Sequence, residues 1–294
     1  MKLKLVRKIF LYVLVLMTIS FGLVLVIYPE RTINRVLADL SKIEFKLMGA
    51  LSHFFPKNSD AEGALLTMVS HRGVVRNGSI ENSHQSIIDT LKAEFKEIEI
   101  DISFSSDFIP FVYHGPGLDL VGRKGLFSDL SSSEIKRCKL INGEYVVTLM
   151  DFCNLYTNKF DRVYLDIKSD NSDHKIKSRM IVEAIGGNNA NNIVLIGYPW
   201  KIMREVKTSL PDIRMGIEQK GAIANFILNG DMVSLHYRNQ FSYAEYKLAK
   251  LLGLDVVTWT VNDTALLKEY SKIYRMQVLT DLHAIQNILW SQKV

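Results

Sequence analysis

The sequence predicts an α/β protein, a TIM (β/α)8 barrel preceded by an N-terminal transmembrane helix. Two observations support this prediction. From residue 65 onward, short apolar runs alternate with helix-length segments, which is typical of parallel strands joined by crossover helices. Near the N-terminus, twenty consecutive residues carry no charge. A chain of 294 residues with 48% hydrophobic residues can bury one sizeable core and an appendage.

The charge-free run spans residues 9–28 and is rich in Leu, Val, Ile and Phe. As a helix, it is long enough to cross a hydrocarbon core. A cleaved signal peptide is the alternative, but its apolar core is usually shorter and ends at a small-x-small site, whereas this run continues to Pro29. We therefore favour an uncleaved anchor in residues 1–30. Its basic first eight residues stay in the cytoplasm, which places the rest of the chain outside it.

Residues 31–64 are predicted to form a helical juxtamembrane linker, because apolar residues recur at helical spacing over 31–55. The helix either packs on the globular domain or forms a stalk, or else it lies on the bilayer as an interfacial helix. The mixed charges of its polar face favour the first interpretation. Residues 56–60 predict a loop, and the globular domain spans 65–294.

Nine apolar runs are candidate strands, which suits an eight-stranded barrel with one extra or shared strand. They span residues 65–70, 97–104, 109–113, 163–167, 193–196, 214–217, 232–235, 255–260 and 277–280. Helical segments between them include residues 83–96, 148–156, 200–210, 243–252 and 264–274. A doubly wound open sheet is the structural alternative, but the sequence has no glycine-rich strand-to-helix turn of the dinucleotide or P-loop kind.

The net charge of +5 is concentrated at the N-terminus. Four of these charges lie in the first eight residues, so the rest of the chain has a net charge of +1. A nucleic-acid partner normally requires a strongly basic face. The sequence therefore predicts no nucleic-acid partner.

Four polar fragments end or directly follow candidate strands. They are His71-Arg72-Gly73, Glu99-Ile100-Asp101, Tyr113-His114-Gly115 and Asp166-Ile167-Lys168. Because the carboxyl ends of barrel strands meet at one rim, we expect these fragments to share one site. Together they supply two histidines, three carboxylates and two cations, a set of groups that suits cleavage of a phosphodiester.

The three acids are predicted to bind one divalent cation, Mg²⁺ or Ca²⁺. Glu99 and Asp101 are two residues apart on a strand, so both side chains point to the same face. Asp166 completes a carboxylate triad, and both metals prefer oxygen ligands. Any one acid could instead cap a helix or pair with a cation, but carboxylates are rarely buried unpaired.

The remaining site residues are predicted to act on the phosphate. His71 and His114 flank it, one taking a proton from the attacking hydroxyl and the other giving one to the leaving alkoxide. Arg72 and Lys168 neutralise its oxygens. Trp259 either forms a wall of the substrate pocket or belongs to the core.

Cys138 and Cys153 match no metal-binding motif. An extracytoplasmic domain would permit a disulfide between them, but buried, reduced thiols are the simpler interpretation because Cys153 lies in an apolar, helix-like stretch. We expect neither thiol to be catalytic.

Six motifs, in order, resemble those of the glycerophosphodiester phosphodiesterase family. Ser70-His71-Arg72-Gly73, Glu81-Asn82-Ser83, Glu99-x-Asp101, Asp166-Ile167-Lys168, Trp259-Thr260-Val261-Asn262 and Thr280-Asp281 are similar to its HRG, ENT, ExD, LEIK, WTVN and TD signatures. The resemblance covers residues 66–285. It implies metal-dependent cleavage of glycerophosphodiesters or lysophospholipid-like diesters, in which a substrate hydroxyl attacks first and forms a cyclic phosphate. The substrate is then a small molecule or a lipid.

Two positions depart from that family's pattern. Gly115 follows His114 where the family usually has Asp, and Asp166 stands where it has Glu. Residues 98–104 followed by 113–115 resemble phospholipase D toxins of the sphingomyelinase D type, which also use Asp as third metal ligand. Two alternatives stay open at this point: an enzyme that releases a cyclic phosphate, and a catalytically inactive barrel that serves as a binding module.

Overall fold

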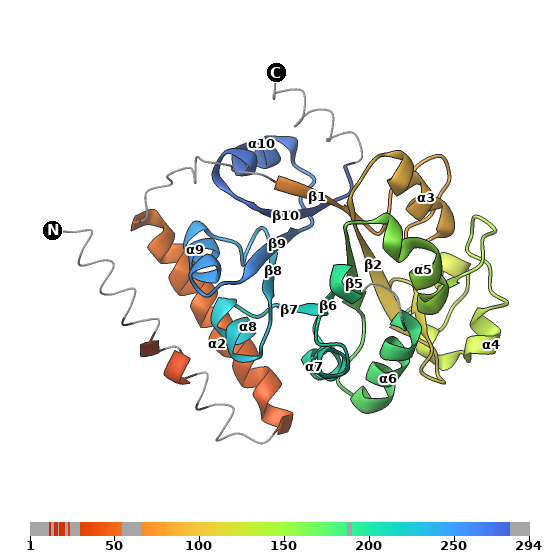
Figure 1. The fold of residues 1–294 in the computed structure, drawn as a ribbon, viewed down its shortest axis with the longest axis horizontal. Coiled ribbons are helices and arrows are strands. Elements are labelled where there is room, and N and C mark those ends of the chain that lie inside the picture. Colours follow the sequence, from red (N-terminus) through yellow and green to blue (C-terminus); the bar gives the residue numbers. More distant parts are fainter. Residues whose placement is uncertain are drawn as a thin grey trace.

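Eight parallel strands close into a barrel in the computed structural model (Figure 1), which describes residues 30–54, 66–186 and 190–282 and isolated positions between 12 and 23. Around the barrel the order is β1 (Leu66–His71), β10 (Met276–Thr280), β9 (Asp255–Trp259), β8 (Met232–His236), β7 (Arg214–Glu218), β6 (Ile193–Gly197), β5 (Arg162–Ile167) and β2 (Glu97–Phe104). Pairing of β1 with β2 closes the ring. The predicted barrel is confirmed, and the open doubly wound sheet is excluded.

Helices surround the strands on the outside of the barrel (Figure 1). They are α3 (His84–Lys92), α5 (Leu149–Tyr156), α6 (His174–Ile185), α7 (Trp200–Ser209), α8 (Ala222–Ile227), α9 (Tyr243–Leu251) and α10 (Thr264–Ile273). Side-chain caps fix several of their starts: Ser83, Thr148, Ser242 and Asp263 each accept a hydrogen bond from a backbone N–H of the first turn. The polar α6 and the short α8 are absent from the predicted segments, because neither presents a long apolar periodicity.

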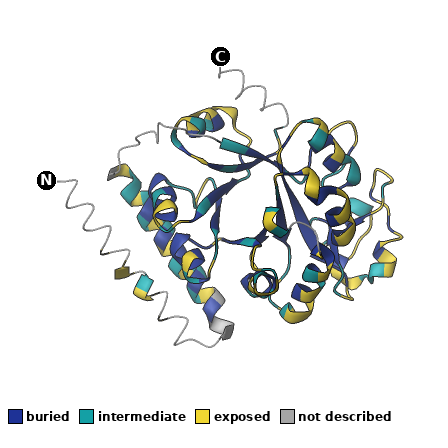
Figure 2. Ribbon diagram, viewed as in Figure 1, coloured by how far each residue is buried: buried dark blue, intermediate teal, exposed yellow. Residues whose placement is uncertain are grey.

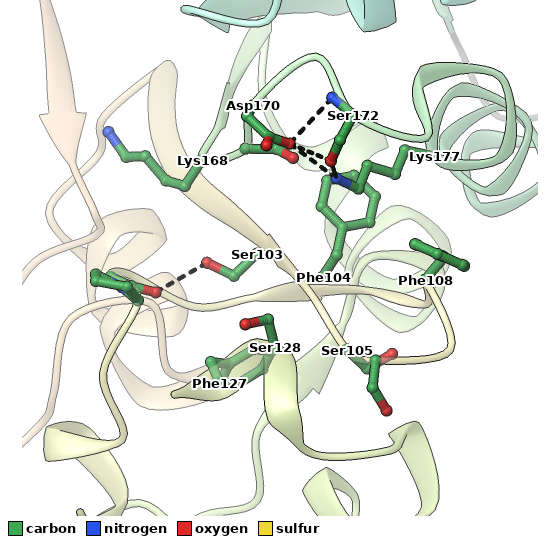
Figure 3. A pocket seen from close by; sticks show the side chains of 14 residues that line it. Ser103, Phe104, Ser105, Phe108, Phe127, Ser128, Lys168, Asp170, Ser172 and Lys177 are labelled. Atoms are coloured by element: carbon green, nitrogen blue, oxygen red, sulfur yellow. Dashed lines mark hydrogen bonds and ion pairs between the residues drawn. The ribbon is translucent and has the colours of Figure 1, made fainter. Parts of the chain in front are cut away.

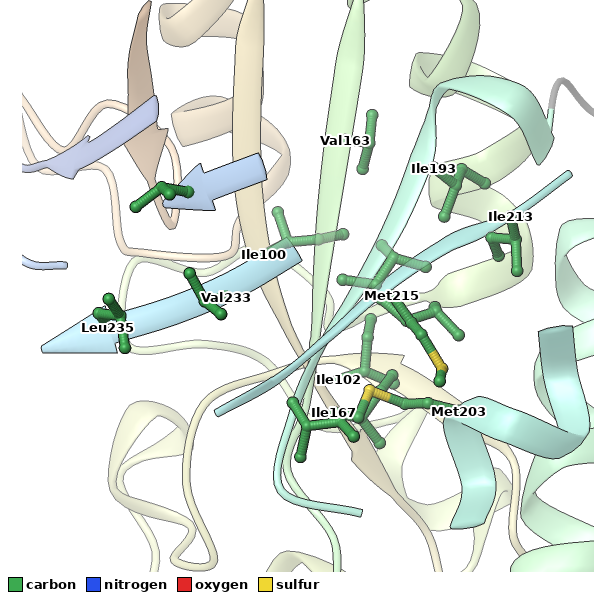
Figure 4. Close-up of a cluster of buried hydrophobic side chains, with 14 of the residues drawn as sticks. Ile100, Ile102, Val163, Ile167, Ile193, Met203, Ile213, Met215, Val233 and Leu235 are labelled. Carbon is green, nitrogen blue, oxygen red and sulfur yellow. The ribbon is translucent and has the colours of Figure 1, made fainter. Parts of the chain in front are cut away.

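The strands are buried on both faces. Their outward side chains, such as Ile100, Ile167 and Met215, pack with Met203 of α7 in the layer between the barrel and its helices (Figure 4). A second, smaller cluster of inward side chains fills the barrel interior; its members are Val69, Tyr164, Val194, Ile196, Met232, Val257 and Leu279. Burial on both sides explains why these strands are near-continuous apolar runs in the sequence.

An insertion between β2 and α5 adds two antiparallel strands, β3 (Pro110–Val112) and β4 (Val147–Thr148). It also holds the short helix α4 (Ser132–Ile135) and a hydrophobic cluster of its own around Phe127. β3 is the extra strand that the sequence predicted. The two-residue β4 was not predicted, since it is too short to show a pattern.

Helix α2 (Glu30–Leu51) packs against α8 and α9, with Ile33, Leu37 and Met48 buried in the main hydrophobic core. Buried and exposed positions alternate along it (Figure 2). Polar contacts add to this packing: Ser41 Oγ accepts from Gly221 N at 3.2 Å, and Ser52 Oγ from Ala244 N at 2.9 Å. In the structure, this segment is thus a helix packed on the barrel helices.

A buried pair of carboxyl groups joins α2 to the barrel helices. Glu44 Oε1 accepts from Ile223 N at 3.1 Å, and Glu245 Oε1 accepts from Ala222 N at 2.8 Å. The two carboxyl groups also contact each other. Burial and the neighbouring Glu245 raise the pKa of Glu44 well above its ordinary value, and burial raises the pKa of Glu245 to about 7. A proton shared between them satisfies both groups.

Among the residues that the structure describes, no helix has both the length and the apolar character needed to span a membrane. Most of the predicted transmembrane segment, residues 9–28, lies outside the described residues.

Both cysteines are buried free thiols, Cys138 in the insertion and Cys153 in α5. The preferred interpretation of reduced thiols is confirmed. Burial raises the pKa of Cys153 to about 11, which keeps this thiol protonated and unreactive at neutral pH.

The Glu44–Glu245 pair predicts a stability that decreases with rising pH. A buried acid with a folded-state pKa near 7, against 4.5 for the free group, loses its favourable protonation as the pH rises from 4.5 to 7. We expect the free energy of unfolding to fall over this range by about 3 kcal/mol more in the native protein than in Glu245→Gln, whose amide oxygen can still accept from Ala222. Urea unfolding at several pH values measures this difference. The exposed Glu183→Gln on α6 is the control, and an equal pH dependence in Glu245→Gln and the native protein would contradict the argument.

Candidate active site

The four predicted fragments meet at the carboxyl ends of β1, β2 and β5. Strand register brings them together: His71 lies opposite Glu99, and Asp101 lies opposite Asp166. His114 follows β3, which pairs with β2 in the antiparallel orientation. The prediction that these fragments share one rim is therefore confirmed, although His114 comes from the insertion and not from a barrel strand.

Glu99, Asp101 and Asp166 form a buried cluster of three carboxylates. One ligand oxygen from each lies within 4.8 Å of the others. Glu99 and Asp101 point to the barrel interior because they alternate with the outward-facing Ile98, Ile100 and Ile102 of the same strand. The strand spacing predicted the shared face of Glu99 and Asp101, and the register between β2 and β5 adds Asp166.

Part of this cluster is satisfied by neighbouring donors. Glu99 Oε2 accepts from the backbone N of Arg72 at 3.1 Å. Asn82 holds Asp101 at two points: its Nδ2 donates to Asp101 Oδ2 at 2.8 Å, and its Oδ1 accepts from Asp101 N at 3.0 Å. Two other buried oxygens, Glu99 Oε1 and Asp166 Oδ1, accept no hydrogen bond from any described residue.

These orphaned oxygens fit a hard divalent cation. Carboxylate oxygens are the ligands that Mg²⁺ and Ca²⁺ prefer, and a buried oxygen without a donor is costly. Burial and repulsion from Asp101 and Asp166 raise the pKa of Glu99 well above its ordinary value, and burial raises the pKa of Asp166 to about 6. A bound cation would relieve both effects.

Two cationic side chains already offset part of the negative charge. Lys168 Nζ lies 3.1 Å from Asp101 Oδ1 and also contacts Asp166 Oδ2. Arg72 Nε lies 3.0 Å from Asp101 Oδ2, and its Nη1 lies 3.1 Å from Glu81 Oε2. Burial lowers the pKa of Lys168, but the charges of Asp166 and Asp101 outweigh it and raise the pKa above its ordinary value.

His71 is oriented by Asp281. Its Nδ1 lies 2.7 Å from Asp281 Oδ1, so Nδ1 donates and Nε2 faces the carboxylates, 3.9 Å from Glu99 Oε2. Asn262 in turn positions Asp281: its Nδ2 donates to Asp281 Oδ2 at 2.6 Å, and its Oδ1 accepts from Asp281 N at 2.9 Å. Burial would raise the pKa of Asp281, but hydrogen bonds from His71 and Asn262 lower it. The motifs near residues 262 and 281 thus hold a histidine from β1.

His114 lies on the other side of Arg72. Its Nδ1 lies 3.1 Å from Glu81 Oε1, and its ring nitrogens lie 3.0 and 3.1 Å from the Arg72 guanidinium nitrogens. Tyr113 N donates to Asp101 O at 3.0 Å and so ties this segment to β2. Burial would raise the pKa of Glu81, but hydrogen bonds from His114 and Arg72 lower it to about 2. Glu81 therefore stays ionised and positions both His114 and Arg72.

Sequence analysis missed one buried acid beside this cluster, Glu218 at the end of β7. Its Oε1 accepts from Ser234 Oγ at 3.2 Å, and Ser234 Oγ accepts from Trp259 Nε1 at 2.9 Å. Burial and the charge of Asp166 raise the pKa of Glu218 to about 8. An acid directly after the predicted strand 214–217 was the available signal.

Trp259 lies at the mouth of the barrel and is only partly buried. It lines a cavity of about 620 Å³ together with His236, Arg238 and Asn262. Its ring packs edge-on against His236, with the ring centres 5.1 Å apart. Trp259 therefore both lines a cavity and packs against the inward apolar cluster of the barrel.

Comparison with protein families confirms the resemblance that the motifs indicated. The model of the glycerophosphoryl diester phosphodiesterase family matches residues 71–196, the part of the chain that carries both histidines and the carboxylate cluster. A search of curated proteins found no significant match.

Several solved structures share the fold. A glycerophosphodiester phosphodiesterase from Parabacteroides distasonis is 21% identical, with a TM-score of 0.69 over 78% of this chain and 98% of that one. An Oleispira antarctica phosphodiesterase in complex with the product sn-glycerol-3-phosphate is also 21% identical, with a TM-score of 0.67 over 76% and 96%. A glycerophosphodiester phosphodiesterase from Thermotoga maritima is 18% identical, with a TM-score of 0.61 over 76% and 98%. The family match supports a phosphoric diester hydrolase, and these neighbours show the shared fold.

The carboxylate cluster predicts a cation-binding site that calorimetry can detect without turnover. We expect Mg²⁺ or Ca²⁺ at about 100 times its Kd to raise the free energy of unfolding by about 2.7 kcal/mol. Glu99→Gln should abolish this stabilisation because it removes a ligand charge. Binding should also weaken as the pH falls below about 6, where Asp166 takes up a proton.

Glu97→Gln is the matched control for this measurement. Glu97 is buried on the same strand, but it accepts from Tyr164 OH at 3.0 Å and lies outside the triad. Equal cation affinity in Glu99→Gln and Glu97→Gln would disprove the assignment.

Proposed function

We propose that this chain, a phosphoric diester hydrolase that matches the glycerophosphodiester phosphodiesterase family over residues 71–196, hydrolyses glycerophosphodiesters or lysophospholipid-like diesters with the help of one divalent cation. One observation carries the proposal: two histidines, each oriented by its own carboxylate, flank a buried cluster of three acids. This set supplies proton transfer on both sides of a phosphate and a place for positive charge beneath it.

Glu99, Asp101 and Asp166 are the residues that would hold the cation, Mg²⁺ or Ca²⁺. When bound, the cation neutralises phosphate charge and makes a nearby substrate hydroxyl more acidic. It would also release Lys168 from part of its pairing with Asp101 and Asp166. The ammonium group could then, together with the Arg72 guanidinium, hold the phosphate oxygens.

His71 and His114 exchange protons with the substrate. One histidine accepts the proton of a substrate hydroxyl as that hydroxyl attacks phosphorus, and the other gives a proton to the departing alkoxide. The product of this step is a cyclic phosphate. With the two roles reversed, water then opens the ring to give a phosphomonoester. Asp281 and Glu81 keep each imidazole oriented throughout.

The glycerol phosphate product held by the Oleispira antarctica enzyme suggests the substrate class for this chain. A glycerol arm carries the hydroxyl needed for internal attack on phosphorus. We propose that Trp259 forms a wall beside the bound diester, since it lines a cavity next to Asn262.

A second candidate function is favoured by Gly115 and Asp166, which match the sphingomyelinase D pattern more closely. An enzyme of that type stops at the cyclic phosphate. Phosphorus NMR of the products separates the two candidates: a linear phosphomonoester supports hydrolysis, and a cyclic phosphate that persists supports the alternative.

The location is proposed from the sequence alone. The charge-free run at residues 9–28, preceded by basic residues, would anchor the chain with its N-terminus in the cytoplasm and the barrel outside. Protease treatment of intact cells tests this arrangement, because only an external barrel would be degraded.

Substitution of either histidine tests the proposed chemistry. We expect His71→Ala and His114→Ala each to lower kcat/KM by about 10²- to 10⁴-fold towards glycerophosphocholine, glycerophosphoethanolamine, lysophosphatidylcholine or sphingomyelin, whichever is turned over. Cation affinity should persist in both variants. His84→Ala is the control, because His84 bonds to Tyr156 OH at 2.8 Å, away from the cluster. Unchanged turnover in either of the first two variants would refute the assigned roles.

Asp281 is predicted to act through His71. Asp281→Asn keeps the shape of the side chain but permits the wrong imidazole tautomer, so kcat should fall by roughly 10²-fold or more. Its pH profile should shift, while cation affinity stays unchanged. Asp212→Asn, which alters an exposed residue between α7 and β7, is the control. A pH profile identical to that of the native enzyme would show that Asp281 is merely structural.

A further inference from the structure

A cavity of about 420 Å³ opens beside the catalytic cluster, between the segments that follow β2 and β5 and the insertion (Figure 3). This volume is within the range of small-molecule sites. Most residues that line this cavity have no role in the proposed reaction. Those that bear on ligand recognition are Ser106, Phe108, Phe127, Ser128, Ser169 and Lys177.

The cavity is continuous with the catalytic cluster. Lys168, which pairs with Asp101 and Asp166, lines its inner end. Gly115, the residue after His114, lines the same end, and its carbonyl accepts from Ser103 Oγ at 3.3 Å. A diester whose phosphate lies at the cluster can therefore extend one arm into this space.

The lining suits a polyol. The side-chain hydroxyls of Ser106, Ser128 and Ser169 make no hydrogen bond to any other described residue, so they are available to a ligand that both donates and accepts. The partly exposed ring of Phe108 offers apolar surface to the C–H faces of such a ligand.

The cavity offers few partners to a quaternary ammonium group, which is normally held by several open aromatic faces or by an unpaired carboxylate. The carboxylate of Asp170 pairs with Lys177 Nζ at 3.2 Å and accepts from Ser172. Lys177 Nζ also lies over the ring of Phe104, 5.8 Å from its centre. The ring of Phe127 is buried against Tyr113, which leaves the partly exposed Phe108 as the one open ring among the described residues that line the cavity.

On the basis of the proposed function, we infer that this cavity holds the alcohol arm opposite glycerol and selects an uncharged polyol over a quaternary ammonium group. The glycerol arm stays at the cluster because its attacking hydroxyl must reach a histidine. The other arm therefore occupies the cavity beyond Lys168, where serine hydroxyls replace its water and where Lys177 already engages the carboxylate and the ring that choline would need.

Two measurements on the full-length protein test this inference. Calorimetry with the inactive His71→Ala variant compares the binding of glycerophosphoinositol and glycerophosphocholine. Kinetics with the native enzyme compares kcat/KM for the same two diesters. We expect the inositol diester to be preferred at least about tenfold in both. Lys177→Met should reduce that preference severalfold. Ser128→Leu should weaken the binding of the inositol diester more than that of the choline diester. Lys175→Met, which removes an exposed charge from the same helix, is the matched control.

Equal binding of the two diesters, or a preference that neither Lys177→Met nor Ser128→Leu changes, would overturn the inference. If Ser128→Leu weakened the binding of both diesters equally, the shared glycerol arm would lie in the cavity, and the inference would again be overturned. Preferential binding without turnover of either diester would support the inference for the cavity and count against the proposed function.

Discussion

The site depends on the cost of burying three carboxylates in one place. Glu99, Asp101 and Asp166 lie inside a protein core, where negative charges repel strongly and where two of their oxygens have no donor among the described residues. Arg72 and Lys168 offset part of this cost, and a divalent cation would offset the rest. Each of the surrounding polar groups either neutralises this cluster or positions a side chain beside it.

That constraint explains the pairing of the other side chains. Arg72 pairs with Asp101 through Nε, and Glu81 holds the Nη1 end of the same guanidinium group. Glu81 in turn orients His114. On the opposite side, Asp281 orients His71 without adding charge to the cluster itself. The two histidines are thereby fixed on either side of the space where a phosphate would lie, which is the arrangement that acid/base cleavage requires.

The barrel supplies rigidity, and the insertion and loops supply selectivity. Parallel strands with inward and outward apolar layers fix the register that places Asp101 beside Asp166. The insertion after β2 brings both His114 and one wall of the serine-lined cavity. In the function proposed here, the barrel keeps the catalytic groups in place while the segments beyond the strand ends form the cavity for the second alcohol.

Local patterns in the sequence predicted the barrel, the ends of its strands and the shared face of Glu99 and Asp101, because these depend on apolar runs and on the two-residue period of a strand. The position of Asp166 beside Asp101, and the groups that act through others, depend on contacts that form only in the folded chain. Asp281 meets His71 from 210 positions away, Glu218 becomes a buried neutral acid beside Asp166, and α2 docks through Glu44. These pairings join residues far apart in the chain, and no local pattern encodes such contacts.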